Sequence, residues 1–188
     1  MRILRILVLS GLMTGTAAYA QKLELAVVGG GMFSSNASTT AAVEGSLAYR
    51  FVGVPMASLY FELPIAAGLE KGTGVQPGLT CTNPCTIVSK YSSLMVGPGV
   101  KLKLAGALPI SPFVTLGVGV AHFNETLASG SNTSNNSTLV QYGGGLDVKV
   151  APFFSLRGEV RDYNSGRVVG TGGRQHNVLA GAGLVFRF

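Results

Sequence analysis

The sequence is poor in charged residues and contains no tryptophan. Charged side chains make up 12% of the 188 residues, about half the roughly 25% usual in water-soluble domains, which argues against an ordinary soluble surface. Hydrophobic residues make up 47%, which is too much apolar material for a disordered chain. The formal net charge of +6 comes from Lys and Arg residues scattered singly, so we expect no nucleic-acid partner.

Long apolar runs are also missing. No window offers the roughly 18 consecutive apolar residues that a membrane-spanning helix needs. The N-terminus has a shorter run, in which Arg2 and Arg5 precede an apolar stretch that ends in Ala18-Tyr19-Ala20. A basic start, a short apolar region and an Ala-x-Ala ending are typical of a secretory signal peptide. We therefore assign residues 1–20 to a signal peptide and expect residues 21–188 to be exported as one domain.

Cysteine is scarce, with only Cys81 and Cys85, both in a polar stretch. In an exported protein two cysteines this close are expected to form a disulfide across a short loop. Zinc would need more ligands than two thiols, and neither His122 nor His176 is near in sequence. We therefore expect a disulfide and no metal site.

What the sequence does contain is a strong period of two, the mark of β-strands. Apolar residues alternate with Gly, Ser, Ala and single charges of both signs in eight segments, the first near Leu23–Phe33 and the last near Gln175–Phe188. A small, sparsely charged second face suits a narrow lumen filled by side chains, while the apolar face suits lipid. This favours an all-β fold, an eight-stranded antiparallel up-and-down transmembrane β-barrel. A soluble periplasmic lipid-binding barrel is the alternative, but it would need a polar exterior.

The connections between the expected strands alternate in length. Long polar connections follow the odd strands, and short proline-containing ones follow the even strands. Strands that shuttle across a membrane give this rhythm, with loops outside the cell and tight turns in the periplasm. The long connections are Ser34–Thr40, Lys71–Ser89, Asn124–Ser137 and Asn164–Arg174, and the short ones are Val52–Pro55, Ala105–Pro112 and Ala151–Pro152.

The chain ends in an alternating strand with Phe186 and the terminal Phe188. Together with the signal peptide, the eight strands and the loop rhythm, this ending resembles the OmpA/OmpX-like outer-membrane β-barrel domain family over residues 21–188. The segment from Arg157 to Tyr163 is also similar to the penultimate strand of many members. The resemblance implies a location in the bacterial outer membrane, outer-membrane lipid as a partner, and barrel insertion machinery that reads the C-terminal strand. The sequence departs from the family in its lack of tryptophan, and we expect no peptidoglycan-binding domain after the barrel.

Strand alternation places several charged residues on the inward face. Single buried charges in a narrow lumen are costly, so we expect them to pair. The network we predict joins Glu44, Glu62 and Glu159 with Lys101, Arg157 and Arg161. The other inward charges are Arg50, Lys103, Asp147, Lys149 and Arg187. An eight-stranded barrel is just wide enough for side chains to fill, which favours a salt-bridged plug over a gated pore.

Catalytic and cofactor sites are not expected. A Ser hydrolase needs a His base within reach of a Ser, and the spacing around His122 and His176 offers no triad. The glycine clusters do not match a nucleotide-binding pattern, so no cofactor is expected. The favoured function is a structural or surface-interaction role, with an extracellular ligand at the loops around Cys81–Cys85 and Asn124–Ser137. A narrow gated pore is the first alternative, and an envelope lipid hydrolase is the weakest.

Overall fold

The computed structural model describes residues 22–35, 39–54, 56–69, 90–105, 108–126, 132–166 and 174–188. The expected signal peptide of residues 1–20 and the expected Cys81–Cys85 disulfide lie outside these residues. The described part of the chain is built from antiparallel strands. They are β1 (Leu23–Ser34), β2 (Thr40–Val54), β3 (Ala57–Leu69), β4 (Lys90–Val96), β5 (Gly99–Leu104), β6 (Ile110–Thr126), β7 (Asn132–Ala151), β8 (Phe154–Ser165) and β9 (Asn177–Arg187).

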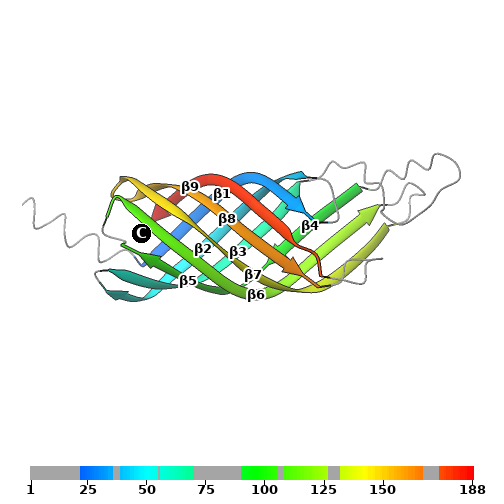
Figure 1. Ribbon diagram of the computed structural model, residues 1–188, viewed down its shortest axis with the longest axis horizontal. Helices are drawn as coiled ribbons and strands as arrows, with labels where there is room; N and C mark the ends of the chain where they lie inside the picture. Colours follow the sequence, from blue (N-terminus) through cyan, green and yellow to red (C-terminus); the bar gives the residue numbers. More distant parts are fainter. Residues whose placement is uncertain are drawn as a thin grey trace, which may run out of the picture.

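The strands close into one barrel, in which β1 pairs with β9 from Glu24↔Arg187 to Ser34↔Asn177. The short segments β4 and β5 act as one strand, because both pair with β3 on one side and with β6 on the other. They are separated at Gly97 and Pro98, and proline has no backbone N–H to offer a β-ladder. The predicted eight-stranded antiparallel barrel is therefore confirmed. Figure 1 shows its inclined strands wrapped around a common axis.

The two ends of the barrel differ. At one end lie the tight connections β2–β3 and β7–β8 together with Phe188, which pairs with Leu23 through two backbone hydrogen bonds. The other end faces the longer connections. The strands run further than the sequence indicated at both ends. In particular, the bounds of the expected loop Asn124–Ser137 are wrong, because residues 124–126 belong to β6 and residues 132–137 to β7, paired as far as Thr126↔Asn132.

The outer face of the wall is apolar and the inner face is mostly polar. On β6, Val118 is 64% exposed whereas the inward Thr115 is 5% exposed, and the same alternation follows the other strands. An apolar outer face and a closed hydrogen-bonded wall suit a hydrocarbon environment. Within the described residues, no helix is long and apolar enough to cross a membrane.

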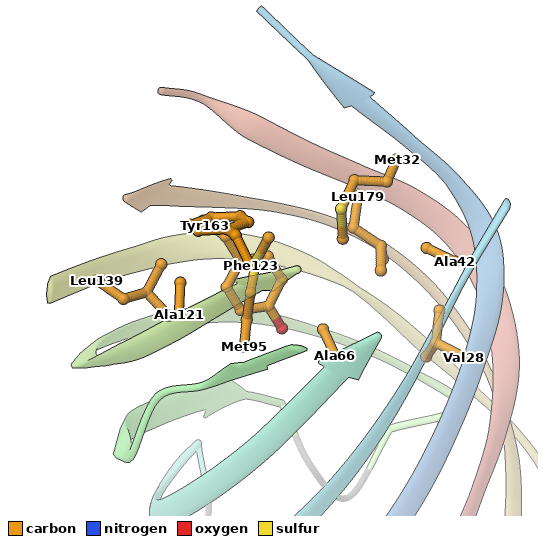
Figure 2. Packing of buried hydrophobic residues seen from close by; sticks show 10 residues of the cluster. All are labelled: Val28, Met32, Ala42, Ala66, Met95, Ala121, Phe123, Leu139, Tyr163 and Leu179. Carbon is orange, nitrogen blue, oxygen red and sulfur yellow. The ribbon is translucent and has the colours of Figure 1, made fainter. Parts of the chain in front are cut away.

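The lumen near the longer connections holds a cluster of buried apolar side chains, here called the apolar plug, shown in Figure 2. Its side chains come from all around the wall and point toward one another. The aromatic ring of Phe123 and the flexible thioethers of Met32 and Met95 are among its largest groups, and thioethers fill irregular spaces well. The plug consists of Val28, Met32, Ala42, Ala66, Met95, Ala121, Phe123, Leu139, Tyr163 and Leu179.

Candidate functional site

The candidate site is the ion-pair network in the lumen, and Glu24 is one of its centres. The Glu24 carboxylate lies 2.5 Å from Lys101 Nζ, 2.6 Å from Lys103 Nζ and 2.6 Å from Arg157 Nη2. Arg187 Nε approaches the same carboxylate at 3.4 Å. Glu24 and Arg157 are 133 positions apart in sequence, and barrel closure brings β1 and β8 within reach of one another. Glu24 therefore links strands from opposite parts of the chain.

Asp147 on β7 is the second acceptor at this level. Its carboxylate lies 2.8 Å from Arg157 Nε, 2.5 Å from Lys103 Nζ and 3.2 Å from Arg187 Nη2. Glu24 and Asp147 thus share three cations, Lys103, Arg157 and Arg187. Each of these cations thus contacts two carboxylates, and these contacts offset part of the free energy needed to remove the charges from water.

Arg161 on β8 is the centre of the layer above. Its guanidinium lies 2.5 Å from Glu159, 3.1 Å from Glu62 and 3.4 Å from Glu44. Tyr163, a member of the apolar plug, donates a 2.6 Å hydrogen bond to Glu44 and so fixes this carboxylate beneath the plug. A contact of 3.2 Å between Lys101 and Glu62 joins this layer to the one around Glu24.

The connected network is neutral by formal charge. It contains five carboxylates, Glu24, Glu44, Glu62, Asp147 and Glu159, and five cations, Lys101, Lys103, Arg157, Arg161 and Arg187. Most of these side chains are almost fully buried. Because the opposite charges balance, this part of the lumen carries no net formal charge that would attract an ion.

Aromatic rings support the cations from the side. Lys101 and Lys103 lie over the Tyr60 ring, with Nζ 5.1 Å and 5.5 Å from its centroid. The Arg157 guanidinium carbon lies 4.4 Å from the centroid of the Phe113 ring. Cations over aromatic faces gain an attraction beyond their ion pairs.

The structure brings together all six residues of the network predicted from sequence. It adds Lys103, Asp147 and Arg187, which the alternation had placed on the inward face but outside the network. Glu24 was missed altogether, although it alternates with the outward Leu23 and Leu25 and could have been found by the same rule. The larger network also uses uncharged side chains, since Arg161 donates to Gln141 and Gln141 in turn donates to the Gly97 carbonyl.

A polar cluster lies on the outward face of β8 and β9 at the end with long connections. His176 Nδ1 is 2.6 Å from Asp162 Oδ2, and Tyr142 donates a 2.7 Å hydrogen bond to the same oxygen. The sequence offered no serine near either histidine, but the structure places Ser35 beside His176, where Ser35 Oγ accepts from the His176 backbone N–H at 3.3 Å. His122, on the outward face of β6, instead has its Nδ1 2.5 Å from Asn136 Oδ1.

The aromatic residues of the C-terminal strand lie at the opposite end. The Phe186 ring packs against Phe154 with ring centroids 5.5 Å apart, and Phe188 is 65% exposed. Their recognition by insertion machinery stays a prediction. Among the described residues, no group of three or more His, Cys, Asp and Glu side chains could hold a metal ion.

A closed antiparallel barrel with an apolar outer face and a polar, packed interior is the architecture of an outer-membrane protein. The model of the outer membrane protein beta-barrel domain family matches residues 6–186. The chain therefore belongs to this family and is a protein of the bacterial outer membrane. This assignment confirms the resemblance seen in the sequence and removes the soluble periplasmic barrel from the alternatives.

Solved structures of outer-membrane proteins are similar to the chain in fold. A major outer membrane protein from Thermus thermophilus has a TM-score of 0.63 and 13% identity, covering 90% of this chain and 100% of that chain. Neisserial surface protein A has a TM-score of 0.59 and 14% identity, covering 89% and 97%. The outer membrane enzyme PagL has a TM-score of 0.51 and 15% identity, covering 88% and 99%. No curated protein matches the chain.

Proposed function

We propose that the protein is a closed membrane anchor that presents the β6–β7 hairpin as a binding surface outside the cell. The observation that supports this most directly is the length of β7. Among the described residues, it pairs with β8 only from Leu139 onward, whereas residues 132–137 pair with β6. Six strand residues span roughly 20 Å at about 3.3 Å per residue, so this part of β7 extends well past its described pairing with β8.

The projecting segment is polar and uncharged. Residues 132–138 carry only amide and hydroxyl side chains, and Ser134, Asn136 and Thr138 are exposed. Such a segment is unfavourable in hydrocarbon, which supports its placement in water beyond the bilayer. Because hydroxyl and amide groups both donate and accept hydrogen bonds, this surface suits a polar, uncharged ligand such as a neutral glycan.

The side chains packed in the lumen support the role of an anchor. The ion-pair network occupies the part near the short turns, and the apolar plug occupies the part near the long connections. Both layers are held from several strands, so a pore would require a large rearrangement.

We also propose that the barrel is not an enzyme. The imidazole of His176 turns toward Asp162 and Asn164 on β8, while Ser35 on the other side meets the backbone N–H of His176. A hydrolase would instead need the serine hydroxyl hydrogen-bonded to the imidazole. In this arrangement the cluster ties β8 and β9 to the end of β1.

A glycan array tests the proposed binding surface. The probes are immobilised neutral and sulfated oligosaccharides, and the samples are bacteria that display the protein. The variant combines Asn124→Ala with Ser134→Ala, two exposed residues that face each other across the hairpin. We expect it to lose about tenfold in binding to a neutral glycan, the equivalent of one or two hydrogen bonds.

The matched control removes the same chemistry elsewhere on the rim, with Ser35→Ala and Asn164→Ala. It should bind like the unchanged protein, and a gel of unheated and boiled samples shows that each variant is folded. The proposal fails if the displayed protein binds none of the glycans. It also fails if both double variants bind as well as the parent.

A further inference from the structure

A cavity of about 310 Å³ opens at the end of the barrel that has the short turns, away from the proposed binding hairpin. Two cations line it, Lys22 just before β1 and Arg50 near the end of β2. Tyr49, Phe51 and Ser58 also line the cavity. Two like charges beside one small cavity create a positive potential that favours an anion.

The backbone holds the two cations side by side. The Arg50 N–H donates a 2.7 Å hydrogen bond to the Lys22 carbonyl, and a β-bulge interrupts the β2–β3 register between Arg50 and Val52. The Arg50 side chain lies over Gly53, where an added Cβ would be 3.4 Å from Arg50 Cδ and 3.5 Å from Nε. Arg50 therefore packs over Gly53, and both residues line the cavity.

The surrounding aromatic residues indicate the level of this cavity in the membrane. Tyr49, Phe51, Phe153 and Phe188 lie at this end and are between 49% and 65% exposed. Exposed aromatic side chains gather where lipid headgroups meet the hydrocarbon. Short turns mark the periplasmic side of an outer-membrane barrel. The cavity is accordingly at the headgroup level of the periplasmic leaflet.

We propose that this cavity binds the phosphate diester of a glycerophospholipid in the periplasmic leaflet. Arg50 and Lys22 donate charge-assisted hydrogen bonds to the phosphate oxygens, and the Ser58 hydroxyl is available as a further donor. The acyl chains continue outward over Tyr49 and Phe51, which are half exposed on the apolar face. This site and the proposed hairpin surface lie at opposite ends of the barrel, on opposite sides of the membrane. Either role can therefore fail without the other.

Native mass spectrometry of the folded protein in an uncharged detergent tests this site. The probe is dioleoyl phosphatidylglycerol, and dioleoylglycerol serves as its counterpart without phosphate. We expect retention of the phospholipid but not of dioleoylglycerol. The substitution Arg50→Gln should weaken phospholipid binding by about tenfold, because it removes a charge-assisted hydrogen bond to the phosphate.

Lys149→Gln is the matched control, because Lys149 also precedes a β-bulge at this end but does not line the cavity. It should bind the phospholipid within about twofold of the parent. Equal losses in Arg50→Gln and Lys149→Gln would overturn the proposed site, as would equal retention of dioleoylglycerol. Glycerol 3-phosphate is the competing soluble phosphate, and complete displacement by an equal concentration would overturn the lipid as its source.

Discussion

At the residue scale, the lumen depends on carboxylates that each compensate several cations. Lys101, Lys103, Arg157 and Arg187 all approach Glu24 within 3.4 Å. Removing one partner of a buried ion pair lowers the free energy of unfolding strongly, whereas replacing both partners with uncharged groups costs much less. Because Glu24 and Asp147 share their cations, we expect the stability of the barrel to depend more on the total charge of the network than on any single contact.

The substitution Glu24→Gln tests this balance. It leaves one uncompensated positive charge in the lumen, and we expect the free energy of unfolding to fall by about 3–5 kcal/mol. Urea titration of the protein in lipid vesicles measures the change. The double variant Glu24→Gln with Lys103→Met restores neutrality and should recover part of the loss. A loss below about 1 kcal/mol for Glu24→Gln would show that charge balance is unimportant here.

At the element scale, inward glycines allow neighbouring strands to approach closely. A Cβ on Gly143 of β7 would lie 2.5 Å from the Val160 carbonyl oxygen and 2.7 Å from the Arg161 Cα on β8. On the outward face of β8, a Cβ on Gly158 would meet nothing within 4 Å. The inner face of the wall is therefore crowded beside Gly143, while the outer face beside Gly158 is open.

The pair Gly143→Ala and Gly158→Ala separates these two environments. Gly143→Ala must push backbone apart beside Arg161, so we expect it to destabilise the barrel by about 1–3 kcal/mol. Gly158→Ala adds an outward methyl group without a clash and should stay within about 0.5 kcal/mol of the parent. The midpoint of urea unfolding compares the two variants with the parent. Equal effects would contradict the steric explanation.

At the scale of the whole molecule, two different layers of side chains follow one another along the lumen. The ion-pair network is polar and neutral, and the apolar plug lies beyond it toward the long connections. Tyr163 connects them through its hydrogen bond to Glu44. Because the plug does not depend on charge, weakening one ion pair should leave the lumen closed.

Conductance in planar lipid bilayers checks this closure. We expect the protein to give currents at background level, with a porin of known conductance as the positive control. Glu62→Gln removes a carboxylate that contacts Lys101 and Arg161, and it should remain silent because the apolar plug is intact. Discrete current steps in the parent protein would support a pore. New openings in Glu62→Gln alone would identify the network as a gate.

The sequence was sufficient where one local rule acts on every residue. Alternation separated the outward Leu47 and Tyr49 from the inward Glu44, and it would have revealed Glu24 as well. It failed at residues 132–137, where amide and hydroxyl side chains are typical of loops. These residues form a strand because β6 offers a paired backbone up to Thr126. Local composition does not report such a neighbour, and neither did it reveal that Ser35 lies beside His176.

The sequence by itself determined the strand period, the apolar outer face and the inward position of most lumen charges, since side chains alternate along any β-strand. Only the tertiary structure decided which charges meet. Closure of the barrel and the tilt of its strands set the level of each inward side chain. They bring Glu24 to Arg157 across 133 positions and Glu62 to Arg161 across 99. These levels depend on register between distant strands, which is a property of the closed wall rather than of any one segment.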